Sequence, residues 1–135
     1  MAITKITDFV ENLSNLDVIG VTRRYDHPPA SVDSADLPVM YPRIPSTNET
    51  PLTFSDQGGW PTLRADLVVL TRMAGEDTQS ENFTETLAMM DEIATALRTT
   101  TNLGKSKITF RIYQSVVEVA GHEMWAVITE VEGKG

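Results

Sequence analysis

Cysteine is absent from this 135-residue sequence. Without a thiol, the chain can form no disulfide, no thiolate nucleophile and no zinc–thiolate site. Long apolar runs are missing as well. No stretch approaches the ~18 apolar residues of a membrane span, and the first residues, MAITKITDFVENL, mix polar with apolar side chains, unlike a signal peptide. We therefore expect a protein that is made in the cytoplasm and does not bind membranes.

Basic residues and histidines are also scarce. Eleven lysines and arginines stand against 19 acidic residues, which gives a net charge of −8 and argues against binding of a nucleic-acid backbone as the main task. The two histidines, His27 and His122, lie far apart and lack metal-ligand spacing. We expect both to be surface turn residues, with no metal site and no catalytic role.

The apolar periodicity predicts one α+β domain over residues 1–135. We expect a mixed, mainly antiparallel sheet of four to five strands packed with two helices, in the order α-β-β-β-α-β-β. The helices are predicted over 3–16 and 81–99, and the strands over 17–26, 37–41, 62–73, 107–119 and 123–131.

The second helix is predicted to bury a stripe formed by Phe83, Leu87, Met90, Ala94 and Leu97, while the position of Met89 stays open. Pro38 and Pro42 predict that the second strand is an edge strand or pairs only briefly. Three of the strands look ten or more residues long, against about five or six in a typical strand. Such strands favour a subunit of an assembly over a compact monomeric enzyme.

The polar stretch 43–59 predicts a long loop, and long loops in compact domains are usually functional or disordered. We expect it to dock onto a neighbour. Its aromatic residues are Phe54 and, at its end, Trp60; Trp60 either anchors an interface or starts the next strand and packs locally. Arg43 either makes a salt bridge between subunits or is solvated. Arg64, Asp66 and Arg72, which alternate with apolar residues, form either the charged rim of a contact or the wet face of a sheet.

Motifs of catalysis and cofactor binding are not recognised. The segment TNLGKS, 101–106, ends like a phosphate-binding loop, but Thr99 stands where the earlier glycine is required and the segment follows a helix instead of preceding one. Gly104 is better explained as a helix C-cap. We expect no catalytic residue and no cofactor. The alternative, a small α/β enzyme or ligand-binding domain, requires a pocket with converging polar groups.

The order of these features resembles that of the tail terminator proteins of long-tailed bacteriophages and of the related tail-completion and neck proteins. The similar features are LPVMYPRIP before the long polar loop, the strand TLRADLVVLTRM, the helix ENFTETLAMMDEIATALRT and the terminal hairpin. The resemblance covers nearly the whole chain and lies mainly in the order and spacing of the elements.

The resemblance implies a structural virion protein at the neck of the tail. Members of this family form a ring, usually hexameric, on the last ring of the tail tube protein; the ring ends tube growth and joins the tail to the head-side connector. DNA passes through the hole without specific binding, and the negative charge would suit that passage, although it would equally keep a small protein soluble. A head-completion or neck ring protein is the alternative within the virion.

Overall fold

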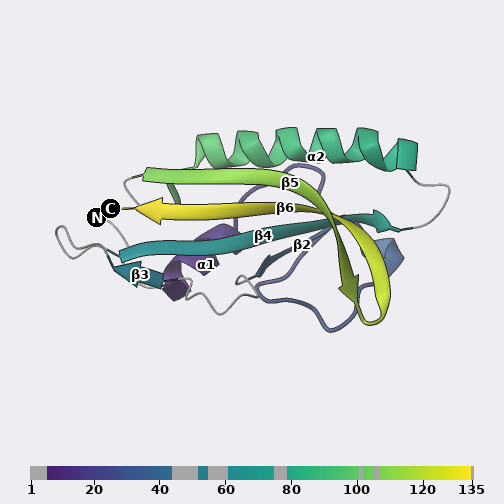
Figure 1. The fold of residues 1–135 in the computed structure, drawn as a ribbon, viewed down its shortest axis with the longest axis horizontal. Coiled ribbons are helices and arrows are strands. Elements are labelled where there is room, and N and C mark those ends of the chain that lie inside the picture. The colour runs from purple at the N-terminus through teal and green to yellow at the C-terminus, as the bar shows by residue number, and fades with distance from the viewer. Residues whose placement is uncertain are drawn as a thin grey trace.

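The computed structural model describes residues 6–43, 52–54, 61–74, 79–100, 102–104 and 107–134. These residues form two helices and a six-stranded sheet (Figure 1). The helices are α1 (Ile6–Ser14) and α2 (Gln79–Thr99), and short 3₁₀ turns lie at Ser34–Asp36 and Asn102–Gly104. The strands are β1 (Arg23–Arg24), β2 (Val39–Arg43), β3 (Leu52–Phe54), β4 (Pro61–Met73), β5 (Lys107–Val119) and β6 (His122–Lys134).

The strands follow the order β1-β2-β4-β6-β5 across the sheet, and β3 pairs with β4 off this path. All pairs are antiparallel except β1 with β2. The predicted fold class is therefore confirmed: two helices combine with a mixed, mostly antiparallel sheet in the predicted order. The short strand β3 lies within the segment predicted to be a loop.

Three strands, β4, β5 and β6, have 13 residues each, which corresponds to about 43 Å of extended chain. β5 and β6 pair along their whole length around a two-residue turn, in which Ala120 and Gly121 both have positive φ angles, 52° and 82°. This conformation matches the tight turn that joins twisted antiparallel strands. The hairpin bends strongly towards its tip (Figure 1).

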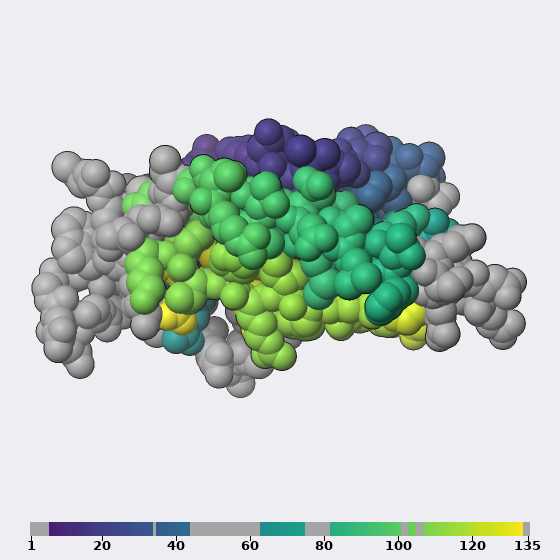
Figure 2. Space-filling model, turned by 90° about the horizontal axis from the view of Figure 1, so that it is seen from above, coloured from purple at the N-terminus to yellow at the C-terminus, as the bar shows by residue number. Residues whose placement is uncertain are grey.

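The main core lies between the two helices and one face of the sheet. Phe9 and Leu13 of α1 and Ile93 and Leu97 of α2 are buried there against apolar residues of β4 and β6. Figure 2 shows α2 flanked on one side by α1 and the chain that follows it, and on the other side by β5. Both helices therefore cover the same face of the sheet.

A second core lies on the opposite face, where the sheet bends. Its buried members come from β2, β4, β5 and β6, and include Val39, Leu70, Met124 and Ile128. Tyr25, Val32 and Leu37, from the segment between β1 and β2, pack against them. Because this segment covers apolar side chains, β4 is buried on both faces over residues 65–71, not on one face as its sequence pattern predicted.

The strand predicted over 17–26 is largely wrong: β1 contains two residues. Gly20 has a φ of 96° within a turn, which ends any extended run from Asp17. The main-chain amides of Thr22 and Tyr25 instead bond to the carbonyls of Pro38 and Met40. The strand flanked by Pro38 and Pro42 is predicted to lie at an edge or to pair only briefly. On the side of β1 its pairing is brief, because it covers two residues of β2 and ends before Pro42.

The predicted stripe of α2 is also corrected. Phe83 and Leu87 are 61% and 48% exposed, whereas Met89 is 6% exposed and Met90 is partly buried. Ala94 and Leu97 are buried as predicted. Towards the N-terminus of the helix, the buried positions are instead Asn82, Thr86 and Met89, each one residue before the predicted one. Polar contacts hold this register: the Thr71 hydroxyl donates to Asn82 Oδ1 over 3.0 Å, and Gln114 Nε2 donates to Thr86 Oγ1 over 3.3 Å.

Candidate interaction surfaces

Six charged side chains lie together on the face of the sheet that the helices do not cover. Strand register brings them together, since Arg43 faces Asp66, Asp66 faces Glu130, and Glu130 faces Arg111 across β2, β4, β6 and β5. We call this set the charged face; it consists of Arg43, Arg64, Asp66, Arg111, Glu130 and Glu132.

Ion pairs within the chain connect the charged face. Arg64 Nε lies 2.7 Å from Glu132 Oε2, and Arg43 Nη2 lies 3.3 Å from Asp66 Oδ2. Arg111 lies 3.7 Å from Glu130 in the same row. The sequence left open whether Arg43 forms a salt bridge with another subunit. In the structure, its guanidinium pairs with Asp66 of the same chain. Its Nε atom is buried and has no hydrogen-bond partner among the described residues.

Asp66 is the least exposed charge on this face. Its sequence pattern placed it on a wet surface, but it is 3% exposed. Burial raises the pKa of its carboxyl above the ordinary value of 3.8, although the hydrogen bond and charge of Arg43 act in the opposite direction. The ionised form of Asp66 therefore costs free energy in the folded protein.

Tyr113 borders the charged face on β5. The Arg111 guanidinium lies 5.0 Å from the centre of its ring, which is within the range of a cation–π contact. Burial, and then the negative charges of Glu130 and Asp66, raise the pKa of the Tyr113 hydroxyl. The phenol stays neutral at physiological pH, and its hydroxyl lies 3.5 Å from Glu130 Oε2.

Arg72 does not lie on the charged face, which corrects its predicted grouping with Arg64 and Asp66. The pairing of β4 with β6 shifts between Leu70 and Arg72, so Arg72 faces Trp125. This irregularity turns the side chain towards α2. There its Nε donates to Glu85 Oε2 over 3.1 Å, and this hydrogen bond lowers the pKa of the Glu85 carboxyl.

The two aromatic residues predicted to anchor an interface receive no structural test. Trp60 lies outside the described residues, as does most of the stretch 43–59. Phe54 belongs to β3, where its backbone pairs with Pro61, but its side chain is not described. Their proposed roles stay predictions.

A surface that the sequence did not predict lies where α2 borders β5. Phe83, Leu87 and Val116 are large apolar residues that are 61%, 48% and 44% exposed. Gln114 contacts Thr86, and β5 runs antiparallel to α2 (Figure 1), so the strand runs from Gln114 towards the N-terminal end of the helix, where the hairpin begins to bend. We call these three residues the edge patch.

The sequence contained a signal for the edge patch, but an ambiguous one. The apolar stripe that begins at Phe83 runs along the whole of α2, whereas the row beside it is apolar only from Met89 onwards. Asn82 and Thr86, which the structure buries, look like surface residues in a sequence. Their hydrogen bonds to Thr71 and Gln114 are contacts across the fold, and no local pattern indicates them.

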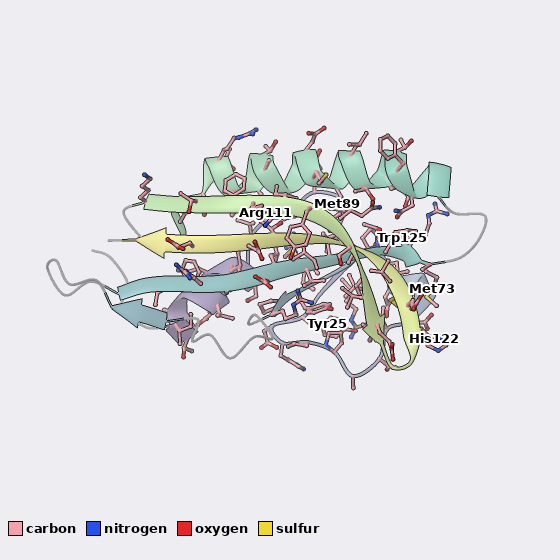
Figure 3. The ribbon with its side chains drawn as sticks, viewed as in Figure 1. Tyr25, Met73, Met89, Arg111, His122 and Trp125 are labelled. Atoms are coloured by element: carbon pink, nitrogen blue, oxygen red, sulfur yellow. The ribbon has the colours of Figure 1, made fainter. Side chains whose placement is uncertain are left out.

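Figure 3 places several labelled residues relative to these surfaces. Met89 points from α2 towards the sheet, Trp125 lies where β6 bends, and His122 lies at the hairpin tip. His122 and His27 are exposed, as predicted for turn residues.

A shallow groove of about 340 Å³ runs along the other flank of α2, lined by residues such as Ile19, Pro38, Ala88 and Glu92. The residues described by the structure contain no group of three or more side chains suited to hold a metal ion. Within the same residues, no helix is long and apolar enough to cross a membrane.

No family model and no curated protein matches this chain.

Proposed function

We propose that this chain is a structural subunit of a phage tail that assembles into a ring, caps the tail tube and joins the tail to the head-side connector. The proposal starts from the resemblance in element order to tail terminator proteins. The sheet gives the strongest structural support, because an open 13-residue edge strand, β5, lies beside the exposed edge patch.

An open edge strand beside apolar surface needs a cover. Unpaired main-chain groups on a long edge template pairing with another chain, and natural proteins usually guard such edges. The edge patch adds apolar side chains that a contact with a second protein would remove from water. A subunit whose neighbours cover this edge in an assembly satisfies both requirements.

The charge of the chain is compatible with a passage for DNA. At a net charge of −8, the surface as a whole repels a phosphate backbone. The arginines of the charged face are engaged with carboxylates of their own chain. A ring of such subunits would let a duplex pass without binding it tightly.

Genetic removal of the chain from its phage tests the function. Without the terminator ring, tail tubes are expected to lack a fixed length and to remain separate from DNA-filled heads, as electron microscopy of lysates would show. Complementation with the parent gene should restore uniform, attached tails. Tails of normal length that fail to attach would favour the alternative neck or head-completion role, and unaltered virions would contradict both roles.

A further inference from the structure

We propose that the α2–β5 edge of one copy binds the β1 edge of a second copy, so that subunits associate head to tail. This inference rests on the proposed ring, because a closed ring needs two different surfaces that fit each other. The two edges lie at opposite ends of the strand order β1-β2-β4-β6-β5.

The first surface combines the edge patch with two acidic residues at the end of the hairpin. Glu118 of β5 faces Glu123 of β6 directly across the hairpin, and both are exposed. Like charges in opposite positions of an antiparallel pair destabilise it. Neither carboxylate forms an ion pair with any residue in the described part of the chain.

These acidic residues lie beyond the edge patch on the same side of the hairpin. Side chains alternate along a strand, so Glu118 shares the face of Gln114 and Val116, which is the face that α2 covers. The surface is thus apolar at Phe83, Leu87 and Val116 and negative at its end. Its complement is a surface with an exposed apolar residue and at least two cations.

The β1 edge supplies such a complement. Arg23 and Arg24 form the whole of β1, and their side chains are 55% and 39% exposed. Ile19, in the turn that precedes them, is 69% exposed, the highest value among the large apolar residues whose side chains the structure describes. Arg23 lies 3.8 Å from the partly exposed Asp36 and 5.1 Å from the centre of the Tyr25 ring. Arg24 lies 3.3 Å from the exposed Asp17 and donates to the Val18 carbonyl. Ion pairs at this degree of exposure are weak enough to exchange for other partners.

Each arginine also suits a contact with an apolar rim. The methylene stem of arginine packs on apolar surface while its guanidinium remains available to carboxylates. When Arg23 and Arg24 approach Glu118 and Glu123 of the next copy, their stems reach the level of Val116. The contact would neutralise a like-charged pair and cover the edge patch at once.

Cross-linking of introduced cysteines tests the contact, and the chain offers a cysteine-free background. Val116→Cys marks the first surface. Thr22→Cys, an exposed position beside β1, marks the second and leaves both arginines in place. Within one copy, β1 and β5 lie about 19 Å apart, four strand spacings, so a short bismaleimide reagent that bridges the two sites must join different copies.

The expected result is a covalent dimer when the two single variants are mixed, and none from either variant alone. A chain with both cysteines should give a ladder of oligomers. Thr109→Cys, on the same strand but remote from the edge patch, is the matched control and should not form dimers with Thr22→Cys. Dimers from Val116→Cys alone would mean that two β5 edges meet each other, and would overturn the proposal, as would the absence of dimers from the mixture at high protein concentration.

Charge exchange tests the ionic part of the contact. Replacing Arg23 and Arg24 by Glu, or Glu118 and Glu123 by Lys, should lower the dimer yield about tenfold or more through like-charge repulsion. Combining all four replacements in one chain should restore it. Equal yields in all variants would contradict the proposed pairing.

The two proposals fail in different ways. The interface is judged by cross-linking of the purified chain, and the function by tail length and attachment in the phage. An open-ended ladder, with no preferred final size, would leave the interface in place but contradict the ring.

Discussion

Two buried threonines on the helix-covered side of the sheet have opposite consequences for stability. The hydroxyl of Thr71 is 3.0 Å from Asn82 Oδ1 and ties β4 to α2. The hydroxyl of Thr129, on β6, is buried with no hydrogen-bond partner in the described structure. A buried polar group without a partner costs about 1–3 kcal/mol. Side chains of the same type therefore stabilise the fold at one position and destabilise it at the other.

Thr129→Val is expected to raise the free energy of unfolding by about 1 kcal/mol, because valine fills the same space without an unpaired hydroxyl. Thr71→Val is the matched control and should lower it, since Asn82 would lose its buried donor. Chemical denaturation of both variants beside the parent measures the two changes. A loss of stability in Thr129→Val would show that its hydroxyl has a partner.

Asp66 provides a pH-dependent test at the same scale. Its pKa is raised in the folded state, so the folded protein binds a proton more readily than the unfolded chain. The free energy of unfolding then falls as the pH rises from 3.8 through the raised value. Glu85 behaves oppositely, because its pKa is lowered: its contribution is present above 4.5 and is lost as the pH falls.

Asp66→Asn removes this titration and keeps an acceptor for Arg43. The Tm of the variant relative to the parent is expected to rise between pH 3 and pH 7. For Glu85→Gln, the same difference should fall over the same range, by a smaller amount because Glu85 is 44% exposed. Thermal melts across this range measure both slopes. A flat difference for Asp66→Asn would mean that burial and Arg43 cancel each other.

At the scale of elements, the sequence predicted most helices and strands because their apolar periods are long. The predictions for the 13-residue β4, the helix α2 and the terminal hairpin are confirmed within a few residues. The strand predicted from Asp17 failed because a turn at Gly20 interrupts a β-branched stretch. Burial of Val68 and Leu70 on the second face of β4 depends on packing with Tyr25, Val32 and Leu37, which are distant in the sequence. Asp66 is buried farther along the same face, where it pairs with Arg43 of β2.

For α2, the local sequence pattern did not determine which face of the helix is buried. The predicted and observed stripes share Ala94 and Leu97. In the N-terminal half of the helix they differ by one helical position, a rotation of about 100°. The choice between them is decided by partners outside the helix, namely Thr71 of β4 and Gln114 of β5. The edge patch is a consequence of this rotation, since it exposes Phe83 and Leu87.

Alanine variants of the two adjacent methionines test this rotation. Met89→Ala is expected to lower the free energy of unfolding by about 2–4 kcal/mol, because it leaves a cavity between α2 and the sheet. Met90→Ala should cost clearly less, since Met90 is only partly buried. Denaturant melts of the pair measure the difference. Equal losses, or a larger loss for Met90→Ala, would favour the stripe predicted from the sequence.

At the scale of the whole molecule, strand register shows how the long polar stretch after β2 is accommodated. Arg43 pairs with Asp66, and Leu52 pairs with Leu63, both along the same side of β4. Along the chain from β2 to β3, the eight residues 44–51 separate the two pairs. On β4, only two residues separate them. The segment 44–51 is therefore six residues longer than the part of β4 between these two pairs, and we call it the insertion.

Replacing residues 44–51 by two threonines would join β2 and β3 into a continuous strand. The variant is expected to melt within a few degrees of the parent, because the ends are already in register and loop-closure entropy changes slowly with length. If the sequence-based prediction that this stretch docks onto a neighbour is right, the variant should fail to complement tail assembly although it folds. The measurements are thermal melting of the purified chain and tail length in complemented phage. A variant with the stability of the parent that also makes tails of normal length would show that the insertion is dispensable for assembly, and would leave the edges of the sheet as the surfaces that the proposed ring would use.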